Sequence, residues 1–180
     1  MDRHDQAQRP APRWRFWKWI LLYFGLVCLG YSQSLIIPVQ FAQRSDWNAS
    51  SFWHAPWGSS GVHKGIDIFA QKGTPVLAPC SGWVLSRGNG PKSGLTVLML
   101  GPNLRLHYMG HLDSIDPAAR GWVRQGTVLG TVGNSGNAVG KPAHLHYAIV
   151  ALIPHPWQIR LVSQGWKRMF FLDPNNWLPG

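Results

Sequence analysis

The chain has 180 residues, of which 45% are apolar and only 13% are charged, so it can build one compact domain of ordinary size. This composition excludes a largely disordered chain, because disordered segments combine few apolar residues with many charges. The formal net charge is +10 and every acidic residue is an Asp, so each carboxylate is a candidate for a specific role. A basic surface attracts any polyanion and therefore does not by itself identify a partner.

The first part of the chain combines a basic tail with a long apolar segment. Residues 1–18 are rich in Arg, and an apolar stretch follows at 19–39. This stretch is long enough to span a bilayer as a helix, and the basic residues before it favour a cytoplasmic N-terminus. We therefore expect a single-pass signal anchor, with the rest of the chain outside the cytoplasm. A signal peptide, with Gly30 and Ser32 at the recognition positions of a cleavage site, is the alternative.

Residues 40–52 are polar and are interpreted as a linker that leads into a single domain at 53–180. Glycine and proline recur in that domain at short intervals, and short runs with β-strand composition lie between them. These runs predict strands at 74–78, 82–87, 95–100, 104–109, 127–132 and 144–153. No stretch of convincing length has the helical period, so the predicted fold class is mainly β.

Two histidines in the last predicted strand, His144 and His146, are separated by one residue. Side chains two apart project to the same face of a strand, so both imidazoles can reach one point. Upstream, His63 and Asp67 lie four residues apart, and Gly65 between them permits a sharp backbone path. Each pattern alone is weak, because paired strand histidines are common and a turn histidine often precedes an Asp that caps a loop.

Together these residues offer two imidazoles and one carboxylate, from His63, Asp67 and one of His144 or His146. Three such ligands with a fourth position left for water are typical of a catalytic zinc site, whereas a structural zinc site more often uses cysteines. The chain has only Cys28 and Cys80, which are far apart in the sequence. We therefore expect neither a cysteine-bound zinc nor a disulfide.

The segment at 61–67 reads GVHKGID and resembles the G-x-H-x-G-x-D signature of the lysostaphin-type (LytM-domain) zinc metallopeptidases. Further segments resemble other landmarks of this family in the same order, at 73–78 (GTPVLA), 81–84 (SGWV), 109–112 (MGHL), 126–136 (GTVLGTVGNSG) and 143–147 (AHLHY). Their order and spacing make the match far more specific than any single piece. Three departures are Ser81, where the family more often has an acid, Met109, where tyrosine is usual, and Ala148, where an acid is frequent.

The resemblance implies an antiparallel β-sheet that forms an open groove with a metal on its floor. It assigns His63, Asp67 and His146 as the ligands of one Zn²⁺ per chain. It also assigns His111 and His144 as catalytic histidines that do not bind the metal.

His107 is the strongest rival of His111, because residues four apart share one face of an unbroken strand. Gly110 indicates that the strand does not continue unbroken, which favours His111. The sequence contains no Glu, so the H-E-x-x-H design is excluded and histidine must supply the acid–base chemistry.

The resemblance further implies a function, and the N-terminal segment described above predicts a location. The expected enzyme is a zinc endopeptidase that uses metal-activated water to hydrolyse peptide cross-links or stem peptides of bacterial peptidoglycan. The N-terminal helix would anchor it in the inner membrane, with the catalytic domain in the periplasm or facing the wall.

A catalytically silent regulator of another cell-wall hydrolase is the alternative, although such proteins usually lack ligands that are all present here. Nucleic acid is not an expected partner, because the chain has an export signal and no recognised nucleic-acid-binding motif. The sequence identifies neither the cleaved bond nor an oligomeric state.

Overall fold

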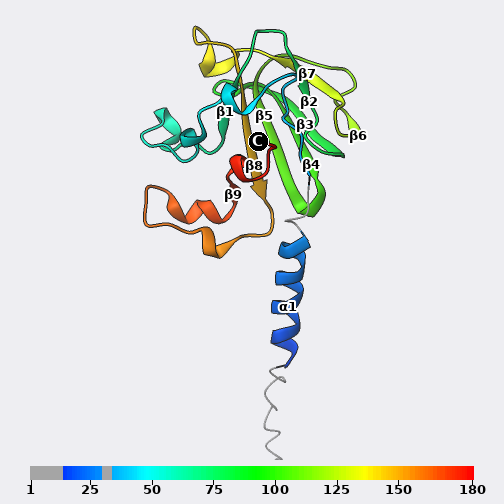
Figure 1. The fold of residues 1–180 in the computed structure, drawn as a ribbon, viewed down its shortest axis with the longest axis vertical. Coiled ribbons are helices and arrows are strands. Elements are labelled where there is room, and N and C mark those ends of the chain that lie inside the picture. The colour runs from blue at the N-terminus through cyan, green and yellow to red at the C-terminus, as the bar shows by residue number, and fades with distance from the viewer. Residues whose placement is uncertain (1–13, 30–33) are drawn as a thin grey trace, which may run out of the picture.

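Nine strands form one antiparallel sheet in the computed structural model, which describes residues 14–29 and 34–180 (Figure 1). The strands are β1 (Ile66–Phe69), β2 (Pro75–Leu77), β3 (Gly82–Gly90), β4 (Gly94–Gly101), β5 (Arg105–Ile115), β6 (Gly121–Val123), β7 (Val128–Val132), β8 (His144–Ala151) and β9 (Phe171–Leu172). Their order is β1-β8-β5-β4-β3-β6, while β2 pairs with β7, β7 with β5 and β9 with β8. Between residues 34 and 180 the remaining elements are 3₁₀ turns and loops, so the predicted mainly β, antiparallel fold is confirmed.

Strands β5 and β8 lie in the interior of the sheet, because each has hydrogen-bonded neighbours on both sides. Leu145, Tyr147 and Ile149 of β8 and Met109 of β5 are completely buried. A strand that is covered in this way has an almost continuous apolar sequence, which explains the hydrophobic run after His144. These two strands are therefore a rigid support for the side chains that alternate with the core residues.

The packed domain begins earlier than the expected boundary at residue 53. Leu35, Val39 and Trp47 belong to the same hydrophobic core as Val76, and Val39 forms an antiparallel bridge with Val76. The end of the expected apolar span and the expected linker therefore pack on the sheet. The sequence does not separate these residues from a membrane span, because an apolar segment can be buried equally well in lipid or in a protein core.

Replacing Val39 by Asp is expected to destabilise the domain strongly. The side chain is only 2% exposed, so the new carboxylate would be buried without a partner, at a cost of about 3–5 kcal/mol. Phe41, two residues further along, is 90% exposed and provides the matched control, because Phe41→Asp should change stability little. Thermal unfolding followed by circular dichroism measures both variants, and equal melting temperatures would show that 34–39 is not part of the core.

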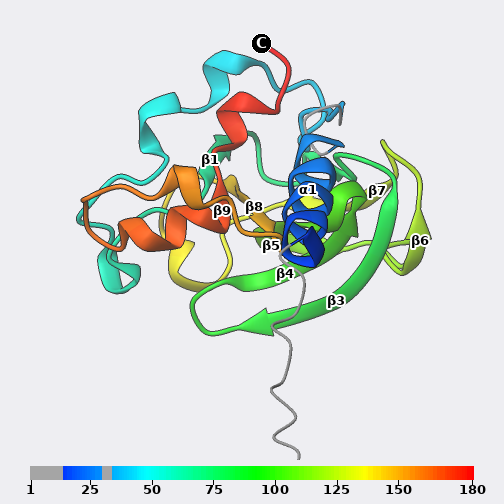
Figure 2. The ribbon, with the colours of Figure 1, turned by 90° about the horizontal axis from the view of Figure 1, so that it is seen from below.

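One helix, α1 (Trp14–Leu29), precedes the domain and projects from one end of it (Figures 1 and 2). The expected membrane span at 19–39 therefore divides into this helix, residues 30–33 outside the described part of the chain, and a segment that joins the domain. No helix among the described residues is long and apolar enough to cross a membrane. Most of the expected cytoplasmic tail, residues 1–13, also lies outside the described residues.

Candidate metal centre

The side chains of His63, Asp67 and His146 meet where β1 pairs with β8. Asp67 lies directly opposite His146 in the antiparallel register, and His63 lies in the turn that leads into β1. Gly65 lets this turn lie against β8, because a Cβ atom at that position would collide with the carbonyl oxygen of Tyr147. The H-x-G-x-D spacing of residues 63–67 is thus the spacing that brings a turn histidine and a strand carboxylate to one point.

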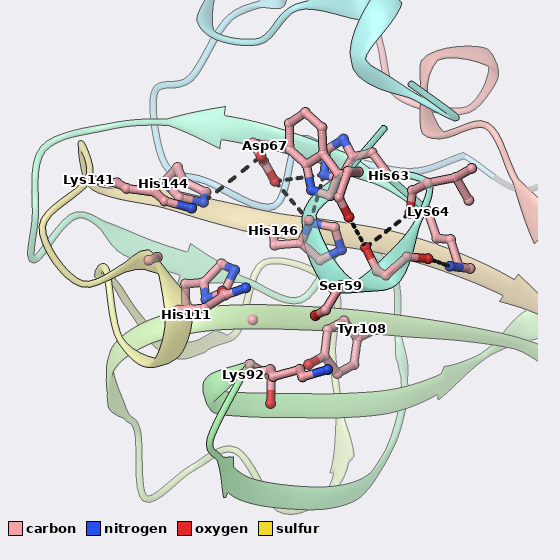
Figure 3. Close-up of a pocket in the computed structure, with 18 of the residues that line it drawn as sticks. Ser59, His63, Lys64, Asp67, Lys92, Tyr108, His111, Lys141, His144 and His146 are labelled. Carbon is pink, nitrogen blue, oxygen red and sulfur yellow. Dashed lines mark hydrogen bonds and ion pairs between the residues drawn. The ribbon is translucent and has the colours of Figure 1, made fainter. Parts of the chain in front are cut away.

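Three atoms of these side chains form a nearly equilateral triangle (Figure 3). His63 Nε2 lies 3.0 Å from Asp67 Oδ1 and 3.1 Å from His146 Nδ1, and His146 Nδ1 lies 2.9 Å from Asp67 Oδ1. Ligands of a tetrahedral ion with bonds of about 2.0–2.1 Å would be separated by about 3.3 Å. The triangle is therefore close to the size that a metal ion with an open fourth position requires.

The arrangement of lone pairs also fits a cation. His63 donates from Nδ1 to the carbonyl oxygen of Ser51 at 3.0 Å, so in the neutral ring Nε2 has no hydrogen. This nitrogen nevertheless faces Asp67 Oδ1, which is an acceptor when ionised. Burial alone would raise the pKa of Asp67, but the adjacent rings of His146 and His63 hold that pKa well below its ordinary value. A divalent cation would satisfy the converging acceptors, and among the described residues these three side chains form the group able to hold one.

Two more histidines, His111 and His144, line the same groove. His144 donates from Nδ1 to the carbonyl oxygen of Pro142 at 2.8 Å, and His111 donates from Nδ1 to that of Ser135 at 2.9 Å. These bonds fix the tautomer, so each neutral ring keeps a lone pair on Nε2. The two ring centres are 5.1 Å apart, and His144 Nε2 lies 4.0 Å from Asp67 Oδ2.

Both rings are close to the candidate metal position. Their Nδ1 atoms are held by backbone carbonyl oxygens and not by the three candidate ligand side chains. The pKa of His111 is lowered mainly by burial, a change that the hydrogen bond to Ser135 partly offsets, and nearby His146 and His144 lower it further. The neutral ring is therefore the favoured form of His111 at neutral pH.

His111, rather than His107, reaches the groove because β5 changes its partner. Strand β5 pairs with β8 from Arg105 to Gly110 and with β7 from Leu112 onward. His111, at the junction, has a positive φ of 62°. The regular alternation of side chains along β5 is interrupted there, and the side chain of His111 faces the groove. His107 is completely buried instead, where its Nδ1 lies 2.8 Å from Tyr147 Oη and burial lowers its pKa to about 3. The break in the strand that Gly110 indicated is thus a change of strand partner and backbone conformation.

A groove of about 710 Å³ opens above these residues (Figure 3). Trp57 lines one side and stacks on the ring of His63, with the centroids 4.1 Å apart. Tyr108 lines the other side, and its ring lies edge-on to His146 with the centroids 6.2 Å apart. Tyr108 is not part of the family motifs found in the sequence. Side chains alternate along a strand, and His107 and Met109 point into the core, so their position could have indicated that Tyr108 faces the groove.

Lysines provide the charge of the groove. Lys64, Lys92 and Lys141 all line it, whereas Asp67 is the one acidic side chain among its lining residues. Neither Lys92 nor Lys141 takes part in an ion pair within the described ranges of the chain. The groove therefore presents positive charge to a bound molecule.

The model of peptidase family M23 matches residues 61–154, which include all four groove histidines and Asp67 as well as the two central strands. The L-Ala–D-Glu endopeptidase of Bacillus subtilis is 35% identical over 115 residues, which cover 59% of this chain but only 35% of that protein.

Two solved structures share the fold. The catalytic domain of lysostaphin from Staphylococcus simulans is 23% identical and superposes with a TM-score of 0.55, covering 69% of this chain and 86% of that domain. LytM from Ruminococcus gnavus is 21% identical and superposes with a TM-score of 0.61, covering 92% of this chain and 71% of that one. At this identity the two structures support the fold alone. Since the family match extends over more than half of the 180 residues, the chain belongs to peptidase family M23.

Proposed function

We propose that this protein is a zinc-dependent endopeptidase that hydrolyses peptide bonds of bacterial peptidoglycan. The observation that carries the proposal is the triangle of His63, Asp67 and His146 on the floor of an open groove, with His111 and His144 beside it. The donor set supports zinc, because two imidazoles and one carboxylate with a free fourth position are typical of catalytic zinc sites. The B. subtilis relative is an endopeptidase that by name acts on an L-Ala–D-Glu bond, which supports a wall peptide as substrate.

Zn²⁺ bound to these ligands would supply a Lewis acid that polarises a peptide carbonyl and lowers the pKa of bound water to about 7. Residues of the chain orient the reaction around it. The carbonyl of Ser51 fixes the ring of His63, so that Nε2 points into the groove. Trp57 covers that ring from one side and keeps bulk water away from it.

His111 and His144 are the candidates for proton transfer. With Nδ1 bonded to a backbone carbonyl, Nε2 of each ring can accept a proton from the attacking water. The protonated ring can then donate a hydrogen bond to the oxyanion or pass the proton to the leaving amine. No acidic side chain other than Asp67 lines the groove, so these imidazoles are the available bases.

The lysines indicate the charge of the substrate. A groove with three lysines favours peptides that carry carboxylates, such as those containing Glu. The side chains of Lys92 and Lys141 have no acidic partner within 4.0 Å among the described residues, so a substrate carboxylate does not have to displace one.

Replacing Lys141 by Gln is expected to lower kcat/KM for a carboxylate-bearing wall peptide about two- to fivefold, mainly through KM. The effect should shrink in high salt, because salt screens exposed charges. Lys72→Gln is the matched control, since Lys72 pairs with Asp113 and does not line the groove. Steady-state kinetics with the peptide and its amidated form measure the difference. An equal loss on both forms would rule out recognition of the carboxylate.

The proposed activity is tested by digestion of isolated peptidoglycan with the purified, zinc-loaded chain. We expect soluble fragments whose masses correspond to cleaved peptide bonds, loss of activity after chelation, and its return when zinc is added. Mass spectrometry of the fragments identifies the bond. A protein that binds one zinc and folds normally but releases no fragments would refute the enzyme and favour a silent regulator.

We also propose that the chain is located at the bacterial inner membrane, with the domain on the outer side. This proposal is supported by the basic tail and apolar segment of the sequence, and by the wall substrate proposed above. Fractionation of cells that produce the full chain, followed by protease treatment of spheroplasts, tests it. Protection of the domain from the external protease would contradict it.

A further inference from the structure

A second surface, on the segment between β8 and β9, is strongly apolar. Residues 152–169 form an arm between β8 and β9, and the arm exposes large apolar side chains to water. Their exposed fractions are 51% for Leu152, 44% for Trp157, 43% for Ile159, 104% for Leu161, 56% for Val162 and 56% for Trp166. Groups of this kind, gathered on one segment, mark an interaction surface.

The arm is a built structure and not a frayed loop. Its base is closed where Ala151 N–H donates to the carbonyl oxygen of Phe170 and His155 N–H to that of Met169. Its tip is closed by a bond from Arg160 N–H to the carbonyl oxygen of Gly165. The backbone therefore holds the apolar side chains outward in fixed positions.

The charged residues of the arm itself are all basic. No acidic residue occurs from 117 to 172, while Arg160 and Lys167 lie in the arm. Two tryptophans accompany these charges. Tryptophan beside lysine or arginine is typical of a surface that sits in the interface of a membrane with anionic headgroups.

The arm is continuous with α1. Tyr23 donates from its hydroxyl to the carbonyl oxygen of Pro154, and the ring of Phe24 stacks on that of Trp157 with the centroids 6.1 Å apart. Trp19 and Leu21 of α1 are each 70% exposed. Exposed apolar side chains of the helix and of the arm are thus brought together by these contacts. The ribbon shows both segments at the end of the domain from which α1 projects (Figure 1).

We propose that the arm docks on a lipid bilayer with anionic headgroups and inserts its exposed apolar side chains into the headgroup region. A second copy of the chain fits this surface less well, because two copies would bring arms of the same charge together. The result is a fixed orientation of the domain. Strand β8 runs from His144 in the groove to Ala151 at the base of the arm, about 24 Å at the usual rise per residue. The metal ligands thus lie about one strand length from the base of the arm, whereas the tip of the arm contacts the rim of the groove, where Gln164 Nε2 donates to the carbonyl oxygen of Ser60 at 2.8 Å.

Fluorescent labels on the full chain in lipid nanodiscs test this proposal. A polarity-sensitive dye is attached to Val162→Cys or, separately, to Leu161→Cys, both in a Cys28→Ser background; Cys80 is only 3% exposed. The matched control is Val139→Cys, because Val139 is 73% exposed and follows the turn at the groove. The nanodiscs contain phosphatidylglycerol and a spin-labelled lipid that quenches the dye on contact.

We expect the dyes at 161 and 162 to shift to the blue and to lose most of their emission, while the dye at 139 is unchanged. Replacing both Arg160 and Lys167 by Gln, or omitting phosphatidylglycerol, should weaken the quenching at 162 several-fold. Emission at 161 and 162 equal to that at 139 would overturn the proposal. A blue shift without quenching would also overturn it, since a protein would then cover the arm. None of these outcomes depends on peptidase activity.

Discussion

Replacing His146 by Ala is expected to remove the bound zinc and to reduce hydrolysis of peptidoglycan to background. His146 Nδ1 supplies one corner of the triangle, at 2.9 Å from Asp67 Oδ1 and 3.1 Å from His63 Nε2. Loss of a group that merely orients a ligand costs about 10- to 100-fold in metal affinity, and loss of a ligand itself should cost more. Metal analysis after dialysis and a digestion assay measure the two effects.

His54→Ala is the control for this variant, because His54 is exposed and is not among the lining residues of the groove. It should keep one zinc per chain and most of the activity. A His146→Ala protein that retained one tightly bound zinc would show that the ion is held elsewhere.

Replacing His144 by Ala is expected to have the opposite pattern, with zinc retained and kcat reduced about 10²- to 10⁴-fold. His144 is anchored to the carbonyl of Pro142, and its Nε2 lies 4.0 Å from Asp67 Oδ2 rather than at a corner of the triangle. KM should change little if the ring acts mainly in the transition state. His111→Ala should behave in the same way, because its ring is anchored to Ser135 and also faces the groove.

The two histidines can also be compared with each other. If His111 and His144 act as a unit, the double variant should be hardly slower than either single one. Loss of zinc from His144→Ala to the same extent as from His146→Ala would contradict the proposed division between ligand and catalyst. Metal content and kcat measured on the same preparations decide between these results.

Local patterns in the sequence predict much of the fold and of the site. The strand that carries His144 and His146 is recognisable from its composition, and alternation along it places the two rings on one face. The close approach of Asp67 to His146 depends on the register between β1 and β8. The register brings together residues that are 79 positions apart in the sequence. Local composition cannot predict such a pairing, whereas the resemblance to the family implies it.

Three features depend on tertiary structure and were beyond local patterns. The position of His111 follows from the change of strand partner in β5, which the sequence shows only as Gly110. The burial of Val39 depends on contact with Val76. Trp83 and Trp122 pack edge to face on each other at the far edge of the sheet and are 54% and 56% exposed, which their local sequence does not indicate.

The most direct test is a crystal structure of the zinc-loaded chain with anomalous diffraction data at the zinc edge. We expect one strong peak about 2.0–2.1 Å from His63 Nε2, His146 Nδ1 and an oxygen of Asp67, with the remaining position open to the groove. A peak bonded to other residues, or an ion whose four positions are all filled by protein atoms, would contradict the proposed catalytic metal centre.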